Sequence, residues 1–123
     1  MKSTKLQDMT VDQLVERFLA IALEQDYALL MDDTERFNRL YGKMAAISQE
    51  LKSREGDQRR ALLRLYGHRN AQVRVTAALA TLAVSPQMAR SALEAIRASQ
   101  EQPQAMDAGM TLWNLDRGVF KPT

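Results

Sequence analysis

The segment from Asn70 to Val84 has the length of a helix and carries apolar residues on two opposite sides. Successive residues of an α-helix are rotated by about 100°. One side then consists of Val75, Ala78, Leu79 and Leu82, and the nearly opposite side consists of Val73, Ala80 and Val84. Two strips separate these sides, one with Arg74 and Thr81 and the other with Gln72 and Thr76. A surface helix needs a single apolar stripe. The segment therefore predicts a helix packed on two sides, as the middle layer of a helical stack.

Two helices are expected before this segment, each with a recognisable start. Thr10 and Gln13 have the spacing of a capping box, with Met9 and Leu14 placed as a hydrophobic staple. The apolar stripe that follows consists of Val11, Leu14, Val15, Phe18, Ile21 and Ala22. The second helix is expected to start near Asp32, with Glu35 three residues on, and its stripe consists of Phe37, Leu40, Tyr41, Met44, Ile47 and Leu51.

Three more helices complete the prediction. A short one is expected over residues 57–66, with Ala61, Leu62, Leu65 and Tyr66 inward and Gly67 as its stop. Ser85-Pro86 marks a cap followed by a proline at the first helical position, opening a helix that buries Met88, Ala89, Ala92, Leu93 and Ile96. The last helix is expected over residues 104–117 and ends at Gly118. The connections are short, which favours antiparallel neighbours.

The length of 123 residues indicates one domain, with residues 1–9 as an N-terminal arm and residues 118–123 as a C-terminal tail. There is no cysteine, which excludes disulfides, thiolate catalysis and cysteine metal ligands. Residues 1–10 lack the apolar stretch of a secretory signal, and the near-apolar run 75–84 is too short to span a bilayer. We therefore expect a soluble cytoplasmic protein without contact to membranes.

Residues 70–79 resemble the HEAT and armadillo class of helical repeats. Such repeats have a turn, then Val-Arg, then two small residues and a leucine, here Asn70, Val73-Arg74, Ala77-Ala78 and Leu79. His68-Arg69 replaces the aspartate that usually precedes the turn and buttresses the arginine. The size and helix order also resemble small bacterial HEAT-like families of unknown function. The resemblance implies an all-α fold, a short right-handed α-α superhelix of five or six antiparallel helices, and it implies no activity.

Candidate catalytic and metal-binding residues are few. His68 is the only histidine and lies between a glycine stop and an asparagine cap, where a solvated turn residue is the simpler interpretation. Asp26, Asp32, Asp33 and Glu35 could surround a cation or act as an acid–base pair, but carboxylates at a helix start also serve as caps. No glycine-rich phosphate loop is present. We expect no enzyme activity, no cofactor and no metal.

The charge is unevenly distributed. Residues 1–53 carry a net charge of −2, residues 54–97 carry eight arginines against three acids for a net +5, and the remaining residues carry −1. We expect an arginine-bearing groove that binds an acidic protein, of the adaptor or immunity type. Its candidate partner-binding residues are Arg60, Leu63, Arg64, Arg90, Glu94 and Arg97. In this scheme Glu94 pairs with both Arg90 and Arg97.

Two alternatives stay open for the arginines. They could form an ordinary solvated helix face, or they could bind the phosphate backbone of a nucleic acid. The small net charge, the presence of Glu94 and the lack of lysines in this region argue against nucleic acid.

The last expected helix is apolar over more than half of its circumference and carries Trp113, the only tryptophan. A terminal repeat should present a polar outer face. Either Val119 and Phe120 fold back over this helix, or the apolar excess marks a contact with another chain, such as a homodimer through Trp113. The first explanation is the one that we expect.

Overall fold

The computed structural model describes residues 5–123, whose regular secondary structure consists of helices, with no strand in this range. The elements in chain order are η1 (Leu6–Asp8), α1 (Val11–Leu30), α2 (Thr34–Ser53), η2 (Gln58–Gly67), α3 (Ala71–Thr81), α4 (Pro86–Ser99) and α5 (Gln104–Asp116), where η denotes a 3₁₀ helix. The predicted all-α fold is confirmed. The chain forms two compact units, Met1–Ala61 and Leu62–Thr123.

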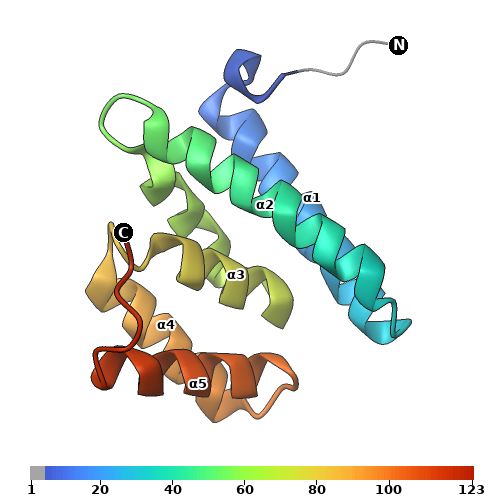
Figure 1. Ribbon diagram of the computed structural model, residues 1–123, viewed down its shortest axis with the longest axis vertical. Helices are drawn as coiled ribbons and strands as arrows, with labels where there is room; N and C mark the ends of the chain where they lie inside the picture. Colours follow the sequence, from blue (N-terminus) through green and yellow to red (C-terminus); the bar gives the residue numbers. More distant parts are fainter. Residues whose placement is uncertain (1–4) are drawn as a thin grey trace. The chain divides into compact units, whose positions relative to one another are not determined.

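The first unit is a helical hairpin of α1 and α2, which lie side by side in Figure 1. The expected capping box opens α1: the Thr10 N–H donates to Gln13 Oε1 over 2.8 Å, and the Gln13 N–H donates to Thr10 Oγ1 over 3.1 Å. The two helices bury the apolar residues Leu14, Val15, Phe18, Ile21, Ala22, Ala28, Leu40, Met44, Ile47 and Leu51.

Two expectations for α2 are wrong. Its N-cap is Asp33 and not Asp32: Asp33 Oδ1 accepts from the Arg36 N–H over 3.1 Å, while Asp32 has a φ of +54° and belongs to the turn. Tyr41 was expected in the buried stripe and is 65 % exposed. Leu40 and Met44, on either side of Tyr41 in the sequence, are buried. The buried strip of α2 is therefore narrower than its pattern of apolar residues indicates.

Arg54 ties the start of the first unit to the end of α2. Its guanidinium donates to the backbone oxygens of Leu6 at 3.0 Å and Met9 at 2.7 Å, and to Glu50 Oε2 at 2.7 Å. Residues 5–9 of the expected arm therefore include η1, held to the end of α2. Residues 1–4 of that arm lie outside the described residues.

The segment η2 was expected as an α-helix over 57–66 and is a 3₁₀ helix. A 3₁₀ helix has three residues per turn, so residues three apart lie above one another. Leu62 and Leu65 have this spacing and both are buried. The change of helix type also rearranges the exposed side chains of η2, as described below.

The helix α3 is buried on the side of Val75 and Ala78, and on the nearly opposite side Val73 is buried as expected. Ala80 and Val84 were expected on that second side and are only half-buried, and Val84 lies beyond the end of α3. Asn70 caps α3, with Oδ1 accepting from the N–H groups of Gln72 and Val73. Seven of its eleven residues are buried, a larger share than in the other α-helices of residues 5–123. Leu79 was also expected on a packed side and is 36 % exposed.

The second unit is built on one apolar cluster. Its buried members from α3, α4 and α5 are Val75, Ala78, Leu82, Ala89, Leu93, Ile96, Ala108 and Leu112. The expected proline occupies the first turn of α4, although the Ser85 side chain makes no cap hydrogen bond. Met88 was expected inside and is 55 % exposed. The core of α4 is therefore the line of Ala89, Leu93 and Ile96, and Met88 lies beside that line.

The buried polar residues of the second unit, Gln72, Thr81 and Gln104, form hydrogen bonds, whereas the buried Nε atom of Arg74 has no hydrogen-bond partner. Gln104 Nε2 donates to Gln72 Oε1 over 2.8 Å, linking α5 to α3. The Thr81 hydroxyl donates to the Ala77 carbonyl oxygen at 2.8 Å and is hydrogen-bonded to the Tyr66 hydroxyl. A hydroxyl has one hydrogen to donate, so Tyr66 is the donor to Thr81.

The Tyr66–Thr81 hydrogen bond gives a prediction for stability. Tyr66→Phe leaves the buried Thr81 oxygen without its donor and should lower the free energy of unfolding by about 1 kcal/mol. Denaturant unfolding of Tyr66→Phe, Thr81→Val and the double variant measures this. The double variant should lose less than the sum of the two single losses. Strictly additive losses would show that the two hydroxyls do not stabilise each other.

Candidate functional site

The candidate residues on α4 form one exposed face. Arg90, Glu94 and Arg97 are spaced by four and three residues, so they lie within about 60° of one another around the helix. They flank the buried line of Ala89 and Leu93. We call Arg90, Glu94 and Arg97 the arginine face.

The ion pairing on the arginine face differs from the expectation. Arg90 Nη2 lies 2.7 Å from Asp116 Oδ1 at the end of α5, and within residues 5–123 Glu94 pairs with neither arginine. The expected pairing was wrong because an acid on the neighbouring helix reaches Arg90. The Arg97 Cδ atom lies 3.5 Å from the position that a Cβ on Gly109 of α5 would occupy. The arginine face therefore adjoins α5.

The other candidates lie on η2, where Arg60 belongs to the first unit and Leu63 and Arg64 belong to the second. An α-helix would align Arg60 with Arg64. In the observed 3₁₀ helix, residues four apart are rotated by about 120°, so the two arginines do not share a face. Arg60 and Arg64 are exposed, and Leu63 is half-buried. The structure thus groups Arg90, Glu94 and Arg97 and does not group Arg60 with Arg64.

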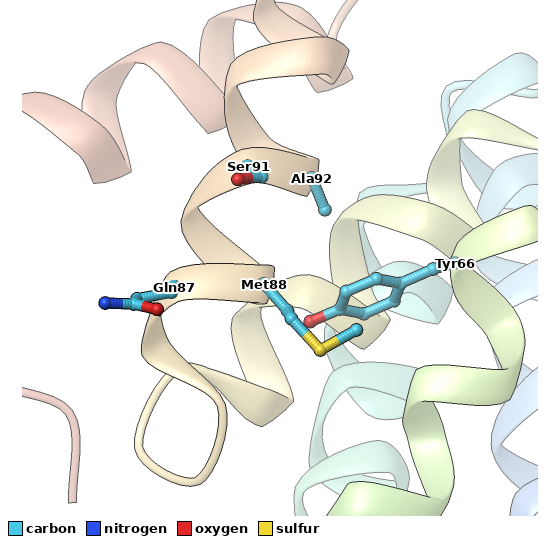
Figure 2. A pocket seen from close by; sticks show the side chains of 5 residues that line it. All are labelled: Tyr66, Gln87, Met88, Ser91 and Ala92. Carbon is cyan, nitrogen blue, oxygen red and sulfur yellow. The ribbon is translucent and has the colours of Figure 1, made fainter.

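A pocket of ≈ 430 Å³ lies on the second unit, lined by Tyr66, Gln87, Met88, Ser91 and Ala92. Figure 2 shows the Met88 side chain beside the Tyr66 ring. Met88 and Ala92 lie on the flank of α4 opposite to the arginine face. Burial raises the pKa of Tyr66, and the hydrogen bond to Thr81 opposes this rise. Tyr66 is the one titratable lining residue, and its hydroxyl is bonded to Thr81, so these five side chains contain no acid–base pair.

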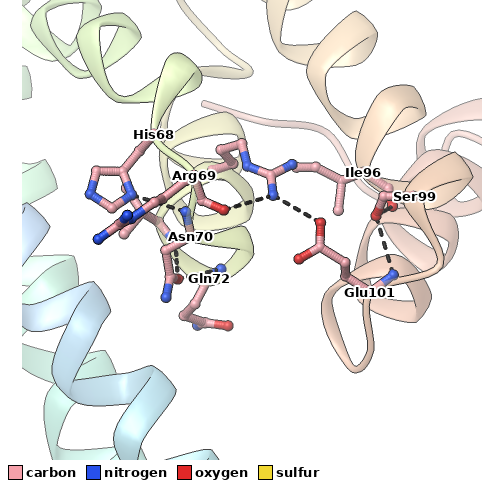
Figure 3. Close-up of polar contacts among 9 residues, drawn as sticks. His68, Arg69, Asn70, Gln72, Ile96, Ser99 and Glu101 are labelled. Carbon is pink, nitrogen blue, oxygen red and sulfur yellow. Dashed lines mark hydrogen bonds and ion pairs between the residues drawn. The ribbon is translucent and has the colours of Figure 1, made fainter.

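Arg74 forms an ion pair with an acid that lies far from it in the sequence. Arg74 Nη2 donates to Glu101 Oε1 at 3.0 Å and to the Arg69 carbonyl oxygen at 3.3 Å (Figure 3). Glu101 lies between α4 and α5, and its N–H donates to Ser99 Oγ. Sequence reasoning missed Glu101, because no local spacing links it to Arg74. This pair holds the loop before α5 to the first turn of α3.

His68 has a structural role in the turn before α3. Its Nδ1 accepts from the Asn70 N–H over 3.0 Å (Figure 3). In residues 5–123 no three side chains of histidine or acidic type converge in a way that could hold a metal ion. Near the end of the first unit, the Arg59 guanidinium beside Asp57 holds the pKa of that carboxyl below its usual range. That pair joins neighbouring residues at the start of η2.

An apolar stripe runs along the outer side of α5. Met106, Met110 and Trp113 are 63 %, 55 % and 60 % exposed, and their spacing of four and three residues aligns them along the helix. We call these three residues the α5 stripe. Arg117 continues it, with its guanidinium carbon 4.4 Å from the centroid of the Trp113 ring. The spacing of four residues between Trp113 and Arg117 could have revealed this contact from the sequence.

The C-terminal tail does not cover the α5 stripe. The N–H groups of Val119 and Phe120 donate to the Asn114 carbonyl oxygen, so the chain turns back after Gly118, which has a φ of +69°. Val119 is nevertheless 64 % exposed, and the Trp113 side chain is 60 % exposed. The expectation that Val119 and Phe120 fold over the last helix is wrong, because Met106, Met110 and Trp113 all stay more than half exposed.

Comparison with known proteins shows the family. A model of a domain of unknown function, DUF2019, matches residues 12–116. The chain belongs to the DUF2019 family. It is also similar to the protein RPA1889 from Rhodopseudomonas palustris CGA009, whose crystal structure matches with a TM-score of 0.95 and 54 % sequence identity, over 98 % of this chain and 100 % of that one. None of the curated proteins compared matches the chain.

The DUF2019 match begins inside α1 and ends with α5, so it includes the arginine face and the α5 stripe. Among the helices of residues 5–123, none has the length and apolar character needed to cross a bilayer.

The exposure of Trp113 gives a spectroscopic prediction. Because Trp113 is the only tryptophan, fluorescence of the dilute protein that is excited selectively at tryptophan, and not at the three tyrosines, reports on the α5 stripe alone. We expect a red-shifted emission that acrylamide quenches readily. Removal of residues 119–123 should leave emission and quenching unchanged. Shielded emission that becomes exposed only after this truncation would contradict the open stripe.

Proposed function

We propose that this DUF2019 chain is a non-enzymatic protein-interaction module that binds an acidic surface of another protein. The contact residues that we propose are Arg60, Leu63, Arg64, Arg90, Glu94 and Arg97. The arginine face is the centre of this proposal. Arginine suits the task because its planar guanidinium binds carboxylates through two parallel hydrogen bonds.

The observation that carries the proposal is the state of Arg97. Its stem lies along α5 beside Gly109, whereas its charged end is exposed and forms no ion pair within residues 5–123. The stem of Arg97 is thus already held in place by packing, and its guanidinium remains available to bind an acidic group of a partner. Preparation of this kind lowers the entropy cost of binding.

We also infer that α3 and α4 form a HEAT-like repeat and that the chain is a short right-handed superhelix from the cytoplasm of a bacterium. Support comes from the contact of α3 with α4, which follow each other along the chain after a short connection, and from the carboxylate of Glu101, which pairs with Arg74 as an aspartate does in such repeats. The similar protein comes from a bacterium. An adaptor or immunity role fits a module of this size.

Binding to a nucleic acid backbone is the weaker alternative. Asp116 already neutralises Arg90, and Glu94 lies between Arg90 and Arg97, so a phosphate chain along this face would meet carboxylates as well as arginines. A protein surface can present both signs of charge and match such a mixture, whereas a phosphate backbone presents one sign.

The proposal predicts that charge reversal on the arginine face weakens partner binding. A tagged chain should capture a protein from a lysate of its host, and Arg97→Glu should reduce the affinity of the captured partner about tenfold, which corresponds to about 1.4 kcal/mol. Arg60→Glu combined with Arg64→Glu tests the η2 part in the same way. Arg17→Glu is the matched control, because Arg17 is an exposed arginine of α1, outside all proposed contacts.

Two results would contradict the proposal. One is equal capture by the wild type, the Arg97→Glu variant and the Arg17→Glu control. The other is tight binding of a generic oligonucleotide, measured by fluorescence polarisation. In that case log K should fall linearly with the logarithm of the salt concentration.

A further inference from the structure

We propose that the α5 stripe binds the α5 stripe of a second copy of this chain, with the two helices antiparallel. Met106, Met110 and Trp113 expose apolar surface on the side of α5 that faces away from the core residues Ala108 and Leu112. Exposed apolar patches of this kind on soluble proteins mark interaction sites.

The spacing of the stripe is self-complementary in the antiparallel arrangement. A two-fold axis that passes between Thr111 and Leu112 brings Met110 opposite Trp113 of the second copy, and Trp113 opposite its Met110. A thioether beside an indole ring is a favourable contact. The same axis brings Met106 opposite Arg117 of the second copy, whose aliphatic stem can cover the methionine. Each stripe residue therefore meets a suitable neighbour.

The charges on α5 select the same orientation. Asp107 lies near the start of the helix and Arg117 follows its end, whereas Asp116, next to Arg117, is already paired with Arg90. An antiparallel pair brings Asp107 of one copy near Arg117 of the other, twice by symmetry, whereas a parallel pair would set like charges together. Partial burial raises the pKa of Asp107, and a guanidinium from a second copy would favour the charged form of this carboxyl. This charge complementarity favours a second copy over an unrelated apolar partner.

The size of the contact sets its strength. A helix of 13 residues is about 20 Å long, and a pair of such helices buries less than the roughly 1,200–2,000 Å² of a standard stable interface. The association is therefore weak and depends on protein concentration. This proposal does not depend on the acidic partner, because Met110 and Trp113 lie outside the contact residues proposed above.

Sedimentation velocity over about 10 µM to about 1 mM protein tests the proposal. The wild type should shift from monomer to dimer, and Met110→Glu should stay monomeric over the range. Met88→Glu is the matched control, because Met88 is equally exposed but lies on α4, outside the stripe; it should dimerise as the wild type does. A wild type that stays monomeric, or equal loss of dimer in both variants, would overturn the proposal.

A charge exchange then tests the orientation. Asp107→Arg and Arg117→Asp should each weaken dimerisation about tenfold, and the double variant should regain most of the loss, because the exchanged charges again oppose each other. Circular dichroism of all three variants establishes that they are folded. Absence of recovery in the folded double variant would overturn the antiparallel pairing.

Discussion

The second unit depends on the packing of α3, whose residues Val75, Ala78 and Leu82 meet α4 and α5 in one apolar cluster. Small residues recur in that cluster, with Ala89 from α4 and Ala108 from α5, and they allow the helix backbones to approach closely. Protein interiors are packed as densely as organic crystals. Removal of a buried methyl group therefore leaves a cavity and lowers the free energy of unfolding.

This packing also decides which surfaces remain for function. Once α4 buries the line of Ala89, Leu93 and Ile96, the arginine face must point outward on one flank and the pocket beside Tyr66 must open on the other. Once α5 buries Ala108 and Leu112, the α5 stripe must point away from the core. The candidate surfaces are therefore the sides of helices that are not buried in the core. Because Gly109 has no side chain, the Arg97 stem can lie against α5 at that residue.

Much of this architecture could be predicted from sequence, because caps and periodicity act over a few residues. The Thr10–Gln13 box, the Asn70 cap and the two buried sides of α3 are local patterns. Periodicity gives the direction of a buried side but not its width, so Tyr41, Met88 and Leu79 were assigned wrongly. The partners of Arg74 and Arg90 are acids 27 and 26 residues away, and no local pattern encodes such pairs.

The most direct test of the account compares three truncations on α3 by denaturant unfolding. Val73 and Val75 lie on opposite sides of the helix and are 0 % and 1 % exposed. Val73→Ala and Val75→Ala should each lower the free energy of unfolding by about 2 kcal/mol, and Leu79→Ala should cost clearly less despite removing a larger side chain. If Val73→Ala is as mild as Leu79→Ala, α3 is packed on one side only and the account is wrong.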